Sequence, residues 1–146
     1  RRMKVGDQIT VGDAAVTAYP STDKGVSFLV EAGGVRIFHA GDLNLWLWPG
    51  MGESEVFEMT SRFREYTHGL KNFWIDTAFL PLDIRQGMYS YLGFDYYMKH
   101  FRIKNAIPMH FFGSSKIVED LMFDPISKSY RNRIVTMERG SRVTLN

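Results

Sequence analysis

Hydrophobic and polar residues alternate in short runs over the first forty positions, which is the pattern of a β-meander. We expect strands over residues 3–10, 14–19, 26–31 and 35–39. The segments between these runs are rich in glycine, aspartate, serine and proline, the residues that form turns. The third and fourth runs are nearly all apolar, which is typical of strands that are covered on both faces.

The spacing of apolar residues lengthens to three and four after an irregular loop over residues 40–52. This spacing predicts a helix over residues 53–71 with one apolar face, formed by Val56, Met59, Phe63, Tyr66 and Leu70. The predicted elements that follow are a strand over 74–80, a helix over 86–101 that Gly93 weakens, a strand over 105–109, a helix over 114–122 and a closing hairpin of 134–137 and 142–145. This order predicts an α/β domain in which helices flank a layered mixed sheet.

The length of 146 residues, without an internal repeat or a linker, predicts a single domain over residues 1–146. The absence of cysteine excludes disulfides, thiolate zinc sites, iron–sulfur clusters and cysteine nucleophiles, and it suits a reducing compartment such as the cytoplasm. The 18 basic and 16 acidic residues leave a net charge of +2, which does not indicate nucleic-acid binding. No apolar run approaches the roughly 18 residues of a membrane helix, so we expect no membrane span.

Two of the four histidines, His39 and His110, stand where a buried-looking strand ends and a loop begins. Rigid strands direct side chains into open loop regions at such places, whereas the other two histidines fall within predicted helices. Asp42 follows His39 after a turn at Gly41, and it either caps the loop or binds a cation. His110 lies among bulky apolar residues, so it is either a hydrogen-bonded core histidine or a metal ligand.

Five sequence blocks span nearly the whole chain: GVSFLVE at 25–31, VRIFHAGD at 35–42, IDTAFLP at 75–81, IPMH at 107–110 and ERG at 138–140. In this order they resemble the metallo-β-lactamase-fold metal-dependent hydrolases, near the ascorbate-6-phosphate lactonase-like and related uncharacterised branches. The resemblance implies the C-terminal half of an αββα sandwich. It also implies that Asp42 bridges two metal ions, that His110 is a terminal ligand of one ion, and that His39 has a supporting role outside the ligand set.

The sequence departs from the family pattern at two places. The family's His-x-His-x-Asp-His motif, which lies in the N-terminal half and supplies most ligands, is absent, and the chain begins at Arg1 instead of methionine. We therefore expect a partial domain whose remaining ligands lie upstream of Arg1. Many relatives also carry a histidine ligand in the loop before the GVSFLVE strand, where Asp23 either substitutes as an oxygen ligand or simply forms the turn.

The leading interpretation is a portion of a metal-dependent hydrolase that acts on a small-molecule substrate. Asp42 and His110 would hold one or two divalent ions, zinc first, although manganese or iron also suits mixed nitrogen and oxygen ligands. A metal-bound hydroxide would attack an ester, lactone or phosphoester bond. Trp46 and Trp48 either wall the substrate pocket or pack in the core.

Other interpretations of the same residues stay open. Asp83 and Arg85 either reach the rim of the same site or form a solvated ion pair on a loop. The alternative function is a non-catalytic half-domain or structural module, since an isolated half of a layered sheet exposes an apolar edge and face. Its partner would be the N-terminal half of the same fold or a second copy in a homo-oligomer. A third interpretation, an RNA-processing nuclease, is disfavoured by the modest charge.

Overall fold

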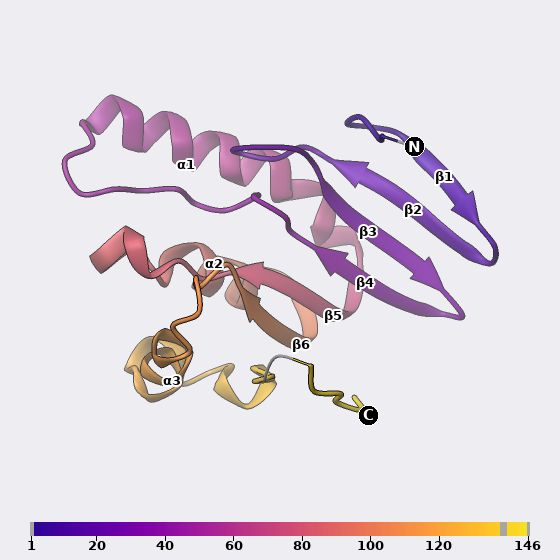
Figure 1. The fold of residues 1–146 in the computed structure, drawn as a ribbon. Helices are drawn as coiled ribbons and strands as arrows, with labels where there is room; N and C mark the ends of the chain where they lie inside the picture. The colour runs from indigo at the N-terminus through magenta and orange to yellow at the C-terminus, as the bar shows by residue number, and fades with distance from the viewer. Residues whose placement is uncertain (1, 138–139, 146) are drawn as a thin grey trace.

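The computed structural model describes residues 2–137 and 140–145, which form one six-stranded mixed sheet with helices packed against it (Figure 1). The strands lie across the sheet in sequence order: β1 (Gln8–Val11), β2 (Ala14–Tyr19), β3 (Ser27–Ala32), β4 (Val35–His39), β5 (Trp74–Pro81) and β6 (Arg102–Met109). Strands β1 to β4 pair antiparallel, whereas β4, β5 and β6 pair parallel. The predicted α/β class with a mixed sheet is therefore confirmed.

A helix connects each parallel pair of strands, because a parallel pair needs a crossover connection. Helix α1 (Glu53–Thr67) joins β4 to β5, α2 (Leu92–His100) joins β5 to β6, and α3 (Lys116–Phe123) follows β6. Short 3₁₀ helices complete the chain: η1 (His68–Asn72), η2 (Ile84–Tyr89), η3 (Pro125–Ser127) and η4 (Arg131–Arg133). Both α1 and α2 pack on the same face, since the ring of Tyr97 lies 5.3 Å from that of Phe63 and 6.0 Å from that of Phe38.

The apolar face predicted for the first helix is the face that packs on the sheet. Phe63 and Leu70 are buried in the core, and the other three predicted positions are partly buried against it. The helix begins after Gly52, whose N–H donates to the Glu55 carboxylate at 2.8 Å. It ends at Thr67 instead of continuing to residue 71, and the chain then tightens into η1.

The two faces of the sheet are not equally covered, which corrects the expectation for residues 26–31 and 35–39. Leu29, Phe38 and Ala78 lie in register on the helix-covered face and are buried. Val30 and Ile37 lie in register on the opposite face, where Ile37 is 37% exposed. We call the row Val16, Val30 and Ile37 the open face, because none of its three side chains is fully buried.

Two further predicted elements are shorter or broken in the structure. The first strand begins at Gln8 instead of residue 3, because Lys4 and Asp7 form a turn in which the Lys4 N–H donates to the Asp7 carboxylate at 2.9 Å. The predicted helix 86–101 is η2 followed by α2, because Gly87 takes a φ of 58° that breaks the helix. Apart from the closing hairpin, the other predicted strands and helices agree with the structure to within a few residues at their ends.

The predicted closing hairpin is wrong for the part of it that the structure describes. Ile134 makes one isolated parallel bridge to Ala106, and residues 135–137 and 142–145 form no strand. Residues 138–139, which belong to the fifth resemblance block, lie outside the described residues. Residues 134 and 135 instead lie beside β6, where the Val135 N–H donates to Ala106 O at 2.8 Å.

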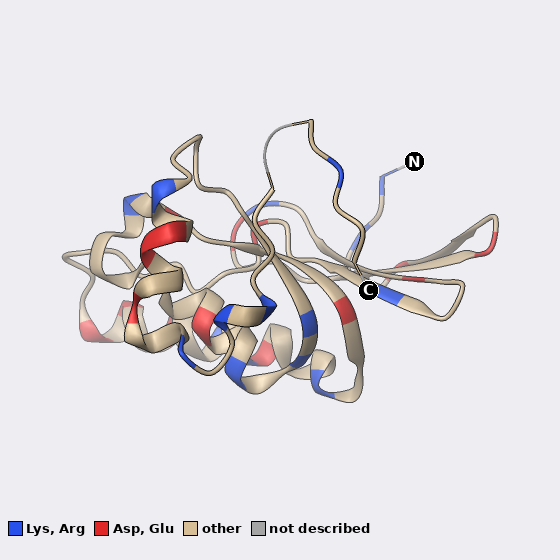
Figure 2. Ribbon diagram, turned by 90° about the horizontal axis from the view of Figure 1, so that it is seen from below, with Lys and Arg blue, Asp and Glu red and all other residues tan. Residues whose placement is uncertain are grey.

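Charged residues of both signs are interspersed along the helices, as Figure 2 shows from below. Among the described residues, none of the helices is both long and apolar enough to cross a membrane.

Candidate metal centre

The loops after β4, β5 and β6 leave the sheet at one edge, because the carboxyl ends of parallel strands lie together. The hydrogen-bond ladder continues past the strand ends: the Ala40 N–H donates to Phe79 O at 3.0 Å and the Leu82 N–H to Met109 O at 2.9 Å. The three loops therefore begin side by side. They carry Asp42, Asp83 and His110, respectively.

Gly41 determines how the first loop reaches this edge. Its φ of 56° is left-handed, and a Cβ there would lie 2.9 Å from the carbonyl oxygen of Val26. A side chain at this position would thus be both strained and crowded. The turn places Asp42 next, and its carbonyl oxygen accepts from Trp46 Nε1 at 2.8 Å.

The imidazole of His110 lies between two carboxylates. Its Nε2 is 3.5 Å from Oδ1 of Asp42, and its Nδ1 is 3.2 Å from Oδ2 of Asp83. The ring also lies 5.3 Å from that of Trp46 and contacts the ring of Phe112 edge-on at 4.9 Å. His110 itself has a φ of 69°, an uncommon conformation for a residue other than glycine.

The side chain of Asp83 is fully buried beside His110. It accepts hydrogen bonds from Arg85 through the backbone N–H (2.9 Å), Nε (3.0 Å) and Nη2 (2.6 Å). Burial would raise the pKa of this carboxyl, but the hydrogen bonds and charge of Arg85, with His110, hold the pKa below its ordinary value. Asp83 thus lies buried behind His110 and only Arg85 reaches the rim of the site, so the pair is not the solvated loop ion pair that was the other interpretation.

An ionised carboxylate only accepts hydrogen bonds, so the contact between Asp83 and His110 requires the proton to be on Nδ1. A neutral imidazole then has its free lone pair on Nε2, which is the nitrogen that faces Asp42. The lone pair of His110 Nε2 and the carboxylate of Asp42 therefore face the same space.

A pocket of about 430 Å³ opens at this cluster, and its walls come from four loops and helix α1. Asp42, His110 and Arg85 lie on one side, and Asp23 and Lys24 from the loop before β3 contribute to the rim. The remaining lining residues are Thr22, Trp46, Trp48, Met59 and Phe112.

The Trp46 and Trp48 rings are parallel, at an angle of 5° with centroids 6.1 Å apart, and both line the pocket. Trp46 is also buried, so it packs in the interior and walls the pocket at once. Asp23 lies on the rim as an exposed side chain, and its role as a ligand stays a prediction.

His39 is outside the lining of this pocket. Its exposed ring stacks on Phe79 at 5.6 Å, and its Nδ1 accepts from the Gly41 N–H at 3.1 Å. His39 therefore contacts the turn that precedes Asp42, and its supporting role stays a prediction. His68 and His100 are exposed, as expected.

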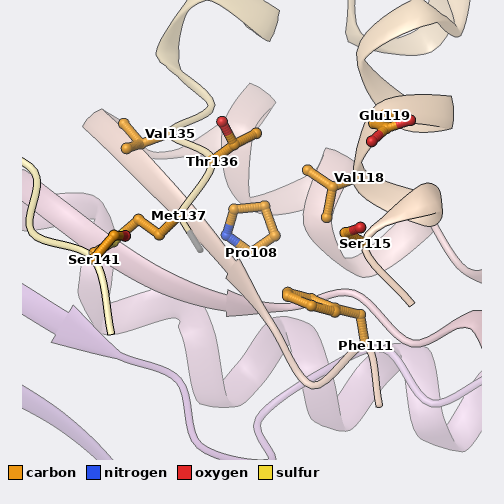
Figure 3. Close-up of a pocket in the computed structure, with 9 residues that line it drawn as sticks. All are labelled: Pro108, Phe111, Ser115, Val118, Glu119, Val135, Thr136, Met137 and Ser141. Carbon is orange, nitrogen blue, oxygen red and sulfur yellow. The ribbon is translucent and has the colours of Figure 1, made fainter. Parts of the chain in front are cut away.

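A second hollow of about 470 Å³ lies beyond the His110 loop, between β6, α3 and the C-terminal segment (Figure 3). Pro108, Phe111, Val118 and Met137 make most of its described lining apolar, and Glu119 is the one carboxylate among the lining residues. Of these two pockets, the 430 Å³ pocket is therefore the one whose described lining combines carboxylate and imidazole groups, which can bind a metal ion.

The residues present fit two positions of a zinc site. Zinc bonds of about 2.0–2.1 Å in a tetrahedral arrangement separate two ligand atoms by about 3.4 Å, close to the distance from His110 Nε2 to Asp42 Oδ1. That measured distance is 3.5 Å. Across residues 2–137 and 140–145, however, no group of three or more His, Cys, Asp or Glu side chains is spaced to hold a metal ion.

Sequence reasoning missed the buried polar network that holds the loop from Asp42 to Trp48. Thr22 Oγ1 accepts from the Asn44 N–H at 3.0 Å and donates to Asn44 O at 2.6 Å. Gln86 Nε2 donates to Leu45 O and Leu47 O, and its Oε1 accepts from Asn44 Nδ2 at 3.0 Å. The one available signal was an asparagine between two leucines in an apolar run, since a buried amide needs partners.

No family model and no curated protein matches the chain, but solved structures do. Zn²⁺-bound PqqB from Methylobacterium extorquens aligns with a TM-score of 0.54 and 16% identity, over 99% of this chain and 52% of that one. The chain therefore shares its fold with this structure. The narrower resemblance to ascorbate-6-phosphate lactonase-like branches stays a prediction.

A second metallo-β-lactamase structure gives a weaker alignment. It is described as a candidate Zn-dependent hydrolase of that superfamily from Thermotoga maritima, with a TM-score of 0.43 and 20% identity, over 74% of this chain and 47% of that one. The chain thus spans about half the length of each of these metallo-β-lactamase-fold structures.

Proposed function

We propose that this chain is part of a metal-dependent hydrolase in which Asp42 and His110 are two ligands of a divalent ion, zinc in the first place. The observation that carries the proposal is the approach of His110 Nε2 to Asp42 Oδ1 at 3.5 Å, at the mouth of a pocket and at the carboxyl edge of parallel strands. A bound divalent cation supplies Lewis acidity and activates water for attack on an ester, lactone or phosphoester bond.

The chain's own residues would bind and orient a small-molecule substrate around this centre. Trp46, Trp48 and Phe112 offer apolar walls, which suit the non-reacting part of a ligand. Lys24 and Arg85 place two cations on the rim, which favours a substrate with an anionic group. Asp23 lies on the same rim, where it would serve as a further oxygen ligand.

The remaining ligands would come from the other half of the same fold. Two ligands are too few for a zinc site, which takes three or four from the protein. PqqB extends for nearly as much chain again beyond the match. The open face, with Ile37 37% exposed, is the apolar surface on which that half would pack.

Zinc titration of the natural full-length protein tests the metal centre. We expect Asp42→Ala and His110→Ala each to weaken zinc binding by at least about 10-fold, since each removes a ligand. His100→Ala is the control, because His100 is exposed and its Nδ1 contacts only its own helix, at Tyr96 O. Zinc affinity that is unchanged in both ligand variants, with the fold intact, would refute the proposal.

A second candidate function is a non-catalytic half-domain that binds a partner chain through the open face. The partly exposed apolar row of Val16, Val30 and Ile37 favours it. Ile37→Glu should reduce assembly, measured by light scattering, under either candidate. The zinc titration separates the two candidates, because only the metal-centre proposal requires zinc at Asp42 and His110.

A further inference from the structure

We propose that Asp83 and Arg85 are positioning residues that fix the ring of His110 so that its Nε2 faces the metal site. This inference rests on the proposed function, and it concerns residues that donate nothing to the metal. Asp83 touches His110 at Nδ1, the nitrogen on the far side of the ring from Asp42.

The Asp83 carboxylate is held so firmly that it can serve as a fixed reference for the imidazole. Its side chain is fully buried, and Arg85 donates to both of its oxygens, from Nε and Nη2. A buried carboxylate with a bidentate arginine has one orientation, because any rotation breaks charge-assisted hydrogen bonds. The acceptor that His110 Nδ1 meets is therefore held in one orientation by these contacts.

Arg85 is in turn held by an aromatic ring that also contacts the histidine. Its guanidinium carbon lies 3.9 Å from the centroid of the Phe112 ring, a cation–π contact. Phe112 meets the ring of His110 edge-on at 4.9 Å. Asp83, Arg85 and Phe112 thus form a closed set of contacts around one side of the imidazole.

The backbone supports the same conclusion, because His110 and Phe112 both have left-handed conformations, with φ of 69° and 50°. Each such conformation costs free energy in a residue with a side chain, so it persists only where the surroundings determine it. Here the surroundings are the contacts of His110 with Asp83 and of Phe112 with Arg85. Carboxylates that accept from the second nitrogen of a metal-binding histidine fix its tautomer and its direction.

The experiment makes two measurements on variants of the natural full-length protein. The first is zinc affinity, measured against a competing chelator. The second is the ¹⁵N spectrum of His110 at pH 9 without metal, which reports the tautomer of its ring. Asp83→Asn puts an amide beside Nδ1. The backbone N–H and Nε of Arg85 both donate to Oδ1, so the amide oxygen stays at that position, and the NH₂ group takes the place of Oδ2 beside His110 Nδ1 at the loss of the Nη2 hydrogen bond. We expect a shift of His110 from the Nδ1–H to the Nε2–H tautomer and a 10- to 100-fold loss of zinc affinity.

Arg85→Lys is the second variant, because Arg85 is half-exposed and the substitution leaves the buried carboxylate in place. Lysine cannot donate in the bidentate manner, so we expect a smaller loss of zinc affinity and a mixture of tautomers. This variant keeps the test decisive if Asp83→Asn does not fold.

Two matched controls lie at the other end of the strands. Arg36→Lys alters an arginine with the same two kinds of partner as Arg85, a carboxylate and an aromatic ring. Arg36 pairs with Glu31 at 2.6 Å, and its guanidinium carbon lies 5.4 Å from the centroid of the Phe73 ring. Asp76→Asn alters a carboxylate that accepts a backbone N–H at 2.9 Å. Neither should change zinc affinity or the tautomer of His110.

The outcomes separate the two proposals. A wild-type tautomer and wild-type zinc affinity in Asp83→Asn and Arg85→Lys, while His110→Ala loses zinc, would overturn the positioning role alone. Zinc affinity unchanged in both Asp42→Ala and His110→Ala would overturn the metal centre and the positioning role with it.

Discussion

Gly93, in the first turn of α2, lies directly against the side chain of Asn44, and a Cβ on Gly93 would overlap Asn44 Oδ1. The same Cβ would lie 3.1 Å from the backbone nitrogen of Leu45. The loop that carries Asp42 therefore packs on the helix at a distance that only glycine permits. The residue that weakens the helix by propensity is required by the loop beside it.

Gly93→Ala should consequently destabilise the protein, although alanine is the better helix former. Overpacking at a buried backbone contact costs about 1–3 kcal/mol of stability. This exceeds the roughly 1 kcal/mol by which the higher helix propensity of alanine would stabilise the helix. Gly69→Ala is the control, because a Cβ there meets only Tyr19 Cε1, at 3.4 Å. Urea unfolding measures both, and a more stable Gly93→Ala variant would contradict the packing described.

Gly41→Ala should cost more free energy of unfolding than Gly12→Ala. Both glycines have left-handed backbones, with φ of 56° and 64°, but only at Gly41 would the Cβ meet an atom, Val26 O at 2.9 Å. We expect about 1–2 kcal/mol for the strain at either position and about 1–3 kcal/mol more for the contact at Gly41. Denaturant titrations measure the free energy of unfolding of both variants. Equal decreases would show that the contact of a Cβ at residue 41 with Val26 O is relieved without a cost in free energy.

Tyr97 should make the protein lose stability in alkali. Its ring is fully buried, its hydroxyl donates to Leu43 O at 2.9 Å, and burial raises the pKa of its phenol well above the ordinary value. The folded state keeps the proton while the unfolded chain releases it above about pH 10. The stabilisation by the neutral phenol is thus complete below pH 10 and declines as the pH rises, by about 1.4 kcal/mol per pH unit.

Tyr97→Phe should remove that part of the pH dependence and, below pH 10, cost about 1–3 kcal/mol because Leu43 O loses its buried donor. The free energy of unfolding of the two proteins should therefore converge between pH 10 and 11.5. Parallel profiles over this range would show that the phenol of Tyr97 reaches solvent in the folded state. Tyr130, whose hydroxyl donates to Asp95 at 3.0 Å and whose pKa burial also raises, should add a similar decline.

Much of the fold was predictable because its elements are defined by local periodicity. The apolar residues of α1 recur every three or four positions, and Phe63 and Leu70 are buried where that spacing places them. The predictions failed where contacts distant in sequence decide. Gly87 breaks the predicted helix 86–101, and residues 142–145 form no strand beside residues 134–137.

Part of the candidate site was predictable for a similar reason. A histidine and an aspartate at strand ends are visible in sequence, so Asp42 and His110 were singled out before their 3.5 Å approach was known. The charge pair at Asp83 and Arg85 could not be interpreted in the same way. A carboxylate two residues from an arginine is usually exposed, whereas the fold buries the side chain of Asp83 completely beside His110.

The amino-acid sequence by itself determined the order of strands and helices, the α/β class and the two side chains at the ends of parallel strands. Periodicity and turn residues act over a few positions, so they are legible without coordinates. Only the tertiary structure decided that Asp83 contacts His110, that Asn44 requires Gly93, and that one face of the sheet stays open. Those relationships depend on strand register and on loops that meet across the sheet edge, and no local pattern encodes either.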